Sequence, residues 1–576
     1  MMMKKIIILL LITNFIALMG SCVRDTAPKP FDFRIAIIGN PANPDIRYDE
    51  AQMTALKELG FNTIQLNIAW GARPADEPLN LEDILYVPGV GDEATAHKRL
   101  TIIKERARIA KQRGFRTLFH FGAPRVSPPL YKILRPDLID IATETYSIQK
   151  KEIIDLYVNL LKRLKQEIPE LDDIQLYTFD QEAWIANEFG DGPLGRDIPL
   201  HERIPAFLSA LTTAWAEVSP NGMLWWEPWE MSAGQIYACI PQLPTKNFGM
   251  FLHSNIAEVQ LTRPVDVWFR NMVILLAERN IPVTGELFMS SAHQEIDSLQ
   301  RLATPRLIGE EIDAMVHLGT VSGIKEYYGM IPDIYDPNII MAGLKIKNPS
   351  MSNKDALQRL SKPFGKNGAA VLEAWELSSQ GMALFPWDAT WHFSQLIQVQ
   401  AGIGVFHTWD AAHIRGEVAP SPSWWSTRRS LFMLTEELTP NPWLLEDVEL
   451  RCAAASAKLL KAVDCFRQVD LSDLNEPYTS YVTANISDLL KMEQIVTAIR
   501  CYCRESNLAF LMRKYVQQGE AIPDNLIRRF EAIMAIDIAN QAKGYVANPG
   551  LPTAAEMLEL FRKDPIQWVT TRLIFR

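Results

Sequence analysis

The sequence contains few of the residues that bind metals or form disulfide frameworks. Among 576 residues there are only 6 cysteines and 9 histidines. The cysteines that follow Cys22 are odd in number and irregularly spaced, which argues against a disulfide framework. Cys501 and Cys503 form a CxC pair, but no histidine or further cysteine lies nearby at ligand spacing, and no HExxH-like pair occurs. We therefore expect neither a metal nor a cofactor.

Other enzyme motifs are missing as well, and positive charge is in deficit. The first predicted strand leads into Gly-Asn-Pro-Ala-Asn-Pro at 39–44, which lacks the glycines of a dinucleotide-binding loop. There is no Gly-x-Ser-x-Gly nucleophile elbow. Asp and Glu number 68 against 58 Lys and Arg, a net charge of -10. Because such a surface repels phosphate backbones, we expect no nucleic-acid partner.

The composition is otherwise that of a globular protein with an excess of tryptophan. Hydrophobic residues make up 48% and charged residues 22%, which excludes a largely disordered chain. The length predicts two or three domains. The 15 tryptophans are informative through their positions, because several follow predicted strands.

Residues 1–22 have the pattern of an export signal. Lys4 and Lys5 precede an apolar run over 6–19, which is too short for a membrane span, and the run ends in Gly20-Ser21-Cys22. This ending resembles the lipobox of bacterial lipoproteins. The resemblance implies cleavage before Cys22, lipidation of that cysteine, a tether over 23–32, and a membrane-anchored protein of the bacterial cell envelope. An ordinary secretory signal that happens to contain Cys22 is the alternative.

From residue 33 onward, short β-rich runs alternate with helical patterns. This alternation is the signature of βα units around a parallel sheet. Eight such units predict a (β/α)₈ TIM barrel over 33–335, with an open doubly wound sheet as the alternative. Helical periodicity dominates afterwards and predicts an all-α C-terminal domain over 336–576. The eight predicted strands are Arg34–Gly39, Thr63–Trp70, Thr117–Gly122, Ile174–Phe179, Met223–Pro228, Phe248–His253, Val283–Met289 and Gly323–Tyr328.

Acidic residues occur at the C-terminal ends of four predicted strands, where a barrel carries its functional side chains. Asp180 and Glu182 follow the fourth strand, and Glu227, Glu286 and Glu326 end the fifth, seventh and eighth. Glycoside hydrolysis needs two carboxyl groups, one that protonates the leaving oxygen and one that attacks or activates water. We therefore interpret the acidic strand ends as candidate catalytic residues, with Glu182 first and Glu286 second.

Aromatic and histidine side chains accompany these acids. Aromatic faces stack on the apolar faces of sugar rings while polar edges bind hydroxyls. Trp225 and Trp226 are adjacent on a strand, so we expect them to point to opposite faces. The expected substrate-binding residues are Trp70, His120, Trp184, Trp226, Glu227, Trp229, His253, Tyr327 and Tyr328.

Two family resemblances support the same reaction class. The acids of strands four and seven resemble the arrangement of clan A glycoside hydrolases, which implies that Glu182 is the acid/base and Glu286 the nucleophile. The segment from Lys345-Ile346-Lys347-Asn348-Pro349 through Asp355 to Ala369-Ala370 is similar to the helical domain of family 67 and 115 α-glucuronidases and of family 20-like hexosaminidases. In those hexosaminidases an Asp–Glu pair at the fourth strand assists the substrate's acetamido group, which implies a pair of Asp180 and Glu182 here.

Three functional hypotheses follow. The first is a lipid-anchored glycoside hydrolase that cleaves a poly- or oligosaccharide by paired-carboxylate catalysis, with Asp180 and Glu326 as further catalytic candidates. The second is a non-catalytic glycan-binding surface lipoprotein, in which the acids only bind hydroxyl groups. The third is a hydrolase or lyase that acts on another kind of bond.

Overall fold

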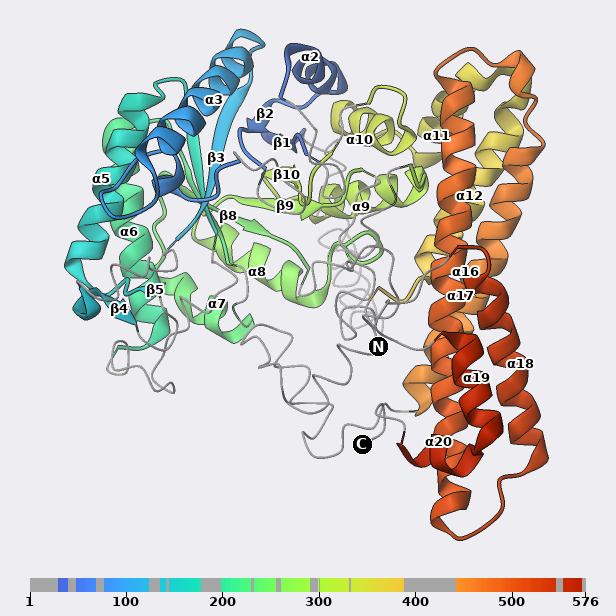
Figure 1. The fold of residues 1–576 in the computed structure, drawn as a ribbon. Helices are drawn as coiled ribbons and strands as arrows, with labels where there is room; N and C mark the ends of the chain where they lie inside the picture. Colours follow the sequence, from blue (N-terminus) through green and yellow to red (C-terminus); the bar gives the residue numbers. More distant parts are fainter. Residues whose placement is uncertain are drawn as a thin grey trace, which may run out of the picture.

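The molecule consists of a barrel and an elongated array of helices beside it (Figure 1). The structure is a computed structural model, and it describes residues 30–39, 48–68, 77–123, 135–140, 145–177, 198–228, 231, 233–254, 260–290, 299, 301–330, 333–387, 442–544 and 553–571. No helix within these ranges has the length and apolar character that crossing a bilayer requires.

Eight parallel strands form a closed barrel, so the predicted TIM barrel is confirmed and the open doubly wound sheet is wrong. Each predicted strand is present, in the predicted order. Each strand pairs with its neighbours in sequence order, and β1 pairs with β10 to close the sheet. The barrel strands are β1 Phe33–Ile37, β2 Thr63–Gln65, β3 Arg116–Gly122, β6 Asp173–Tyr177, β7 Leu224–Glu227, β8 Phe248–Leu252, β9 Val283–Leu287 and β10 Gly323–Glu326.

Helices surround the barrel as an outer ring. Glycine ends two of the βα units, because Gly60 and Gly114 adopt the left-handed conformation (φ 102° and 73°) between a helix and the next strand. A short antiparallel pair, β4 Ile139–Asp140 and β5 Thr145–Tyr146, lies between β3 and α5. The ring helices are α2 Glu50–Leu59, α3 Glu93–Gln112, α5 Lys151–Glu167, α6 Leu200–Val218, α7 Ala233–Cys239, α8 Val267–Glu278, α9 Pro305–Leu318 and α10 Pro337–Lys347.

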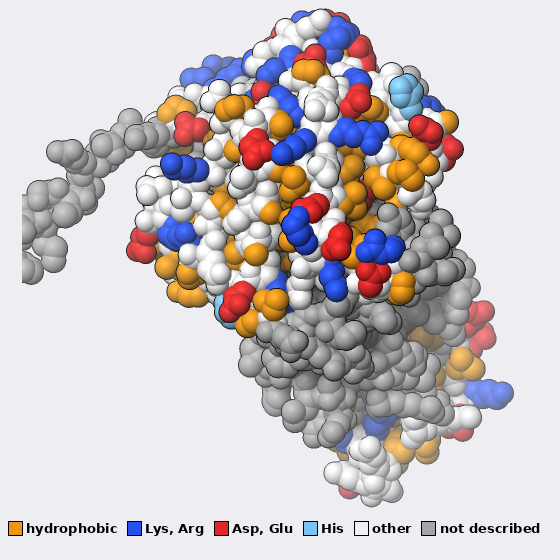
Figure 2. Space-filling view, turned by 90° about the vertical axis from the view of Figure 1, so that its left-hand side faces the viewer, with side chains coloured by type: hydrophobic (Ala, Val, Ile, Leu, Met, Phe, Trp, Pro, Cys, Tyr) orange, Lys and Arg blue, Asp and Glu red, His pale blue; other side chains and the backbone are white. Residues whose placement is uncertain are grey.

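Ion pairs link neighbouring helices of the ring. Lys104 of α3 contacts Glu167 of α5 at 2.6 Å, and Lys162 of α5 contacts Glu217 of α6 at 2.7 Å. Figure 2 shows acidic and basic side chains interspersed over this flank of the barrel. Because both members of each pair are partly exposed, these pairs contribute little to stability, on the order of 0–1 kcal/mol each.

The C-terminal half is helical, as predicted. α17 is a single helix of 40 residues. The helices are α11 Asn353–Ser361, α12 Gly368–Leu384, α16 Pro442–Arg467, α17 Tyr478–Gln517, α18 Asp524–Gln541, α19 Ala554–Lys563 and α20 Pro565–Thr571.

The barrel and the first C-terminal helices share one hydrophobic core. Buried residues of the barrel, of α12, of α16 and of the first half of α17 belong to a single cluster, whereas the end of α17 packs with α18, α19 and α20 in a second cluster. α10 contacts α2 and α9, so it closes the ring of barrel helices. The last helix of the barrel therefore lies beyond residue 335, in the segment that the sequence assigns to the helical domain.

Candidate active site in the barrel

The interior of the barrel begins as an apolar floor. Ile35, Leu118, Trp225 and Phe251 form a separate buried cluster inside the sheet. The rings of Trp225 and Phe251 are stacked, with centroids 4.8 Å apart and planes 5° from parallel. Gly249 makes room for this indole, because a Cβ at that position would lie 2.4 Å from Trp225. The narrow end of the barrel is thus filled by side chains, and chemistry is confined to the other end.

Two carboxylates point into the barrel above this floor. The strand pairing matches Glu286 to Lys325 and Glu227 to Tyr177, and paired residues of parallel strands face the same side. In a TIM barrel, inward side chains from alternate strands share a layer. The pairing registers therefore place His120 of β3, Glu227 of β7 and Glu286 of β9 in one layer, at the C-terminal ends of their strands.

Glu286 is neutralised by a lysine from the neighbouring strand. The Nζ atom of Lys325 lies 2.7 Å from Oε1 of Glu286, and neither side chain is exposed. Oε2 of Glu286 is buried and has no hydrogen-bond partner among the described residues. Burial of a carboxylate is costly unless it is paired, so the ammonium explains how one acid can be kept in this interior. The second oxygen is left available to another group.

Glu227 lies in a different environment. Its Oε2 accepts a hydrogen bond from Nε2 of Gln175 and lies 3.8 Å from Nε2 of His120. The backbone of His120 is held by Asn67, whose Oδ1 accepts the His120 N–H at 3.0 Å and whose Nδ2 donates to the His120 carbonyl at 2.8 Å. The two interior carboxylates thus have different partners, a cation for Glu286 and polar side chains for Glu227.

Aromatic rings surround the carboxylates on the side of the barrel mouth. We call the rings of Tyr177, Phe288 and Tyr327 the aromatic rim. Tyr177 lies 5.2 Å from the ring of His120, and Phe288 lies 5.3 Å from Tyr327 in an edge-to-face arrangement. Such rings offer flat apolar faces next to acids, which is the combination that sugar rings require.

His253, which follows β8, lies next to the aromatic rim. Its ring lies 5.7 Å from that of Tyr327. Burial lowers the pKa of His253, against the opposing charge of Glu286, which raises it. Nδ1 of His253 lies 2.5 Å from the carbonyl oxygen of Ser254, which can only accept a hydrogen bond. The proton therefore resides on Nδ1, and Nε2 is the acceptor nitrogen.

Two sequence predictions are corrected by the alternation of side chains along the strands. Trp226 and Glu326 are both fully buried and both point away from the barrel interior. Trp226 belongs to the main core between sheet and helices, so it does not line the mouth. The carboxylate of Glu326 accepts backbone N–H groups behind the sheet, which removes it from the interior acids. Tyr328 also follows the outward alternation, and only its ring edge approaches the rim, 6.3 Å from Phe288.

The structure brings together Glu227, Glu286, His120, His253 and Tyr327 of the predicted site. Asn67 and Phe288, which follow strands, were not predicted as site residues, and neither were three strand residues, Gln175, Tyr177 and Lys325. Strand pairing matches each of these three strand residues to an inward residue of a neighbouring strand. The register relative to Glu286 and Glu227, together with the alternation of side chains along each strand, would have indicated them. The remaining predicted residues lie outside the described residues, namely Cys22, Trp70, Asp180, Glu182, Trp184 and Trp229.

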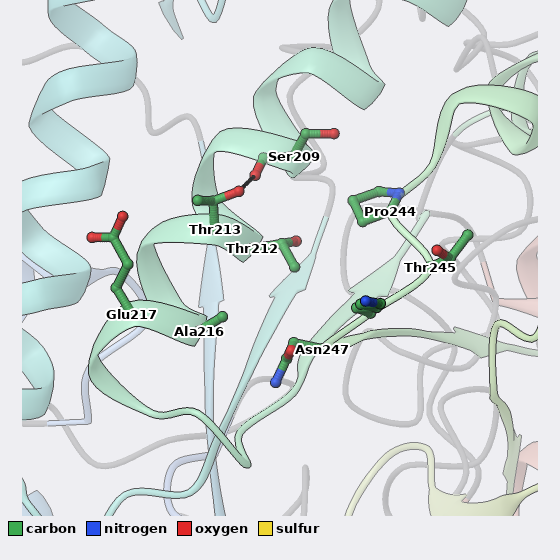
Figure 3. Close-up of a pocket in the computed structure, with 9 residues that line it drawn as sticks. Ser209, Thr212, Thr213, Ala216, Glu217, Pro244, Thr245 and Asn247 are labelled. Carbon is green, nitrogen blue, oxygen red and sulfur yellow. Dashed lines mark hydrogen bonds between the residues drawn. The ribbon is translucent and has the colours of Figure 1, made fainter.

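A surface pocket lies at the opposite end of the barrel. It has a volume of about 590 Å³ and is formed between α6 and the segment that precedes β8. Figure 3 shows Ser209, Thr212 and Thr213 on α6 across from Pro244. This pocket contains none of the interior acids, and it adjoins the N-terminal ends of the strands, which in TIM barrels serve stability.

The described residues contain no group of three or more His, Cys, Asp or Glu side chains that could hold a metal ion. No disulfide bond joins the cysteines among these residues. The C-terminal end of the described interior carries two carboxylates, two imidazoles and one ammonium group, from Glu227, Glu286, His120, His253 and Lys325.

No protein-family model and no curated protein matches the chain. Among solved structures, the chain is similar to a GH138 enzyme targeting pectin rhamnogalacturonan II, with a TM-score of 0.56 and 12% identity over 97% of this chain and 86% of that one. An O-GlcNAc hydrolase of Thermobaculum terrenum gives a TM-score of 0.41 at 12% identity, covering 90% of this chain and 98% of that one. The glycoside hydrolase family 5 enzyme PbGH5A of Prevotella bryantii B14 gives 0.36 at 14%, covering 56% and 100%. These neighbours are glycoside hydrolases, and the likeness to the GH138 enzyme shows that this chain has the fold of such an enzyme.

Proposed function

We propose that the chain is a glycoside hydrolase whose substrate enters the mouth of the barrel. The observation that carries the proposal is the layer in which Glu227 and Glu286 face the barrel interior beneath the aromatic rim. Two inward carboxylates with different partners, next to rings that can stack on sugars, supply both the acid–base groups and the binding surface that glycoside cleavage needs.

Glu286 has the surroundings expected of the catalytic nucleophile, the carboxylate that attacks the sugar or stabilises the charge that develops on it. Its Oε1 is paired with the ammonium group of Lys325, and its Oε2 has no hydrogen-bond partner among the described residues. This agrees with the nucleophile role that the seventh-strand position implies in clan A enzymes. Glu182 remains our proposed acid/base, with Asp180 beside it. Glu227, held by Gln175, is assigned to substrate binding or to proton transfer in place of Glu182.

A poly- or oligosaccharide is the proposed substrate, and the bacterial cell envelope is the proposed location, through a lipid at Cys22. The glycosidase fold and the acid–aromatic interior support the first part. The residues Gly20-Ser21-Cys22, which resemble a lipobox, support the second. Metabolic labelling with an alkyne fatty acid, compared between the full chain and Cys22→Ala, tests the anchor, because only the unaltered chain should carry label.

A glycan panel with mass analysis of the products tests the reaction. Wild-type protein should release defined sugars from at least one substrate in a panel of 4-nitrophenyl glycosides and plant or host polysaccharides. Glu286→Gln and Glu182→Gln should each lower kcat on the order of 10²–10⁴-fold while the protein stays folded. Asp524→Asn is the control, because Asp524 is an exposed carboxylate at the start of α18 and is not part of the barrel. Binding without any hydrolysis would overturn the proposal in favour of a glycan-binding protein.

A further inference from the structure

Glu326 is a buried acid that the proposed chemistry does not use. Its side chain is not exposed and lies behind the barrel wall. Oε2 accepts the N–H of Met289 at 2.8 Å, and Oε1 accepts the N–H groups of Tyr328 and Gly329, each at 3.2 Å. The donors come from two different strand ends, the one that follows β9 and the one that follows β10. One carboxylate therefore ties both segments together.

The tied backbone groups are next to residues of the aromatic rim. Met289 follows Phe288, and Tyr328 follows Tyr327, whose rings meet at 5.3 Å. A second contact joins the same segments, because Oγ of Ser290 donates to the carbonyl of Gly329 at 3.0 Å. A shift of either segment would therefore move one ring of the pair relative to the other.

Gly329 gives the second segment the turn that this arrangement needs. Its φ of 136° lies in the region that favours glycine. A Cβ at this position would come within 3.0 Å of the carbonyl oxygen of Gly39 on the first strand segment. Local conformation and close packing thus combine to direct the Gly329 N–H toward Glu326.

The charges that face Glu326 come from its own strand and from α9. Lys325 precedes it in sequence, and Glu311 of α9 is the second acid buried on this side of the sheet. Burial raises the pKa of Glu326 to about 7, opposed by the three backbone N–H groups and by Lys325. Burial and the charge of Glu326 raise the pKa of Glu311 well above its usual value. Placing Glu311 next to Glu326 in a buried position costs free energy of folding. The three backbone hydrogen bonds that Glu326 accepts offset part of this cost.

We propose that Glu326 is a positioning residue for the aromatic rim. Its carboxylate holds the ends of β9 and β10 together, and this fixes Phe288 and Tyr327 beside Glu286 in the geometry that binds a sugar ring. The role in substrate binding rests on the proposed function, whereas the backbone clamp itself does not.

Amide hydrogen exchange tests the clamp without any substrate. In Glu326→Gln, one carboxylate oxygen becomes an NH₂ group that faces N–H donors. The amides of Met289, Tyr328 and Gly329 should then exchange about tenfold faster or more, as expected for the loss of a hydrogen bond to a charged group. Asp524→Asn, at the exposed start of α18, is the control and should leave these three amides unchanged. Unchanged exchange of the three amides in Glu326→Gln would overturn the proposal.

The wild-type protein provides a second measurement, which does not depend on the folding of a variant. Burial raises the pKa of Glu326 to about 7, so the closed site binds this proton more tightly than a site opened to solvent. After correction for the intrinsic pH dependence of exchange, protection of the same three amides should therefore fall as the pH rises toward about 7. A flat protection profile between pH 5.5 and 8.5 contradicts the clamp.

Kinetics separate positioning from a general structural role. With the 4-nitrophenyl glycoside that the wild-type enzyme hydrolyses, Glu326→Gln should raise KM severalfold and change kcat less, because Glu286 and Lys325 are retained. A merely structural role would lower kcat through loss of folded protein and leave KM unchanged, which overturns the proposal. If the wild-type protein hydrolyses nothing, the proposed function fails while the exchange experiment still decides the clamp.

Discussion

Glu286 and Lys325 form an ion pair of 2.7 Å in which neither side chain reaches solvent. The pair joins adjacent strands of the barrel, β9 and β10, at the level of the second interior carboxylate. A buried pair of this kind contributes less than its Coulomb attraction, because both charges had to leave water. Removing one partner lowers the free energy of unfolding strongly, because the other charge is then left alone in a poorly solvating interior.

Lys325→Met should therefore destabilise the protein by about 3–5 kcal/mol, because Glu286 would lose its counter-charge. Urea unfolding, followed by circular dichroism, measures the change in free energy of unfolding. The double variant Lys325→Met/Glu286→Leu removes both charges and should recover most of the loss. A double variant that is no more stable than Lys325→Met would show that packing, and not the unpaired charge, causes the effect.

Gly249→Ala should disturb the floor of the barrel. The new Cβ would lie 2.4 Å from the Trp225 ring, which is stacked on Phe251 and cannot easily move. We expect a loss of about 1–3 kcal/mol, as for other overpacked cores, measured by thermal unfolding. Gly285→Ala is the matched control on a nearby strand, because its Cβ would meet the flexible end of Met315 at 2.8 Å. Equal losses in the two variants would contradict the special role of the Trp225 stack.

The barrel could be predicted because its signals are local. Alternating β-rich runs and helices, with glycines such as Gly60 and Gly114 between them, mark the βα units one by one. Periodicity also predicts helices in the second half, but it cannot show that α17 continues for 40 residues. The apolar residues in the first part of α17 pack into the core shared with the barrel, whereas those in the last part pack against α18, α19 and α20. The apolar face of the helix therefore changes along its length.

The candidate site was only partly predictable, because a strand end does not reveal which face a side chain occupies. Glu326 and Trp226 are next to inward residues but point outward. A lysine near a strand end does not by itself indicate a catalytic site. Only the pairing register shows that Lys325 meets Glu286, and register is a property of two strands rather than one.

Stability should fall as the pH rises, and Asp537 of α18 should account for part of this. Burial, and then the charge of Glu505 on α17, raise the pKa of Asp537 to about 7. A carboxyl whose folded-state pKa is raised binds its proton more tightly when folded, so its contribution is present below the unfolded value near 4 and is lost as the pH passes 7. Asp336, with a pKa of about 6, and Glu326, with one of about 7, act in the same direction.

Asp537→Asn should therefore flatten the dependence of the melting temperature on pH between about 4 and 7. The difference between variant and wild type should change by an amount on the order of 2 kcal/mol across this window. Thermal melts at half-unit pH intervals provide the measurement. Asp524→Asn, at the exposed start of the same helix, serves as the control and should keep the wild-type slope. An Asp537→Asn profile parallel to that of the wild type would refute the assignment.

Helix α17 forms hydrogen bonds to the segment that joins β9 to α9, and this contact connects the helical half to the barrel mouth. Nδ2 of Asn485 donates to the carbonyl of Arg301 at 2.6 Å, and Asp488 accepts the Arg301 N–H at 2.8 Å. The guanidinium of Arg301 in turn contacts Asp333, which follows β10, at 2.5 Å. The backbone between the two strands that carry Glu286 and Lys325 is thus held from the helical side.

Asn485→Leu should cost about 1–3 kcal/mol, because the Arg301 carbonyl loses the donor that the buried Asn485 provides and the leucine cannot replace it. The loss of stability should be local as well as global, so exchange of the Arg301 and Leu302 amides should accelerate more than that of the β3 amides on the far side of the barrel.

Lys491→Ala is the matched control on the same helix. Lys491 lies 3.5 Å from Asp488 but is 54% exposed, so its removal should cost less than about 1 kcal/mol. If both variants lose the same stability and the exchange at Arg301 stays at the wild-type rate, α17 packs against the barrel without positioning its mouth. Preferential loosening at Arg301 would instead show that the helical half helps to hold the strand ends on which the proposed chemistry depends.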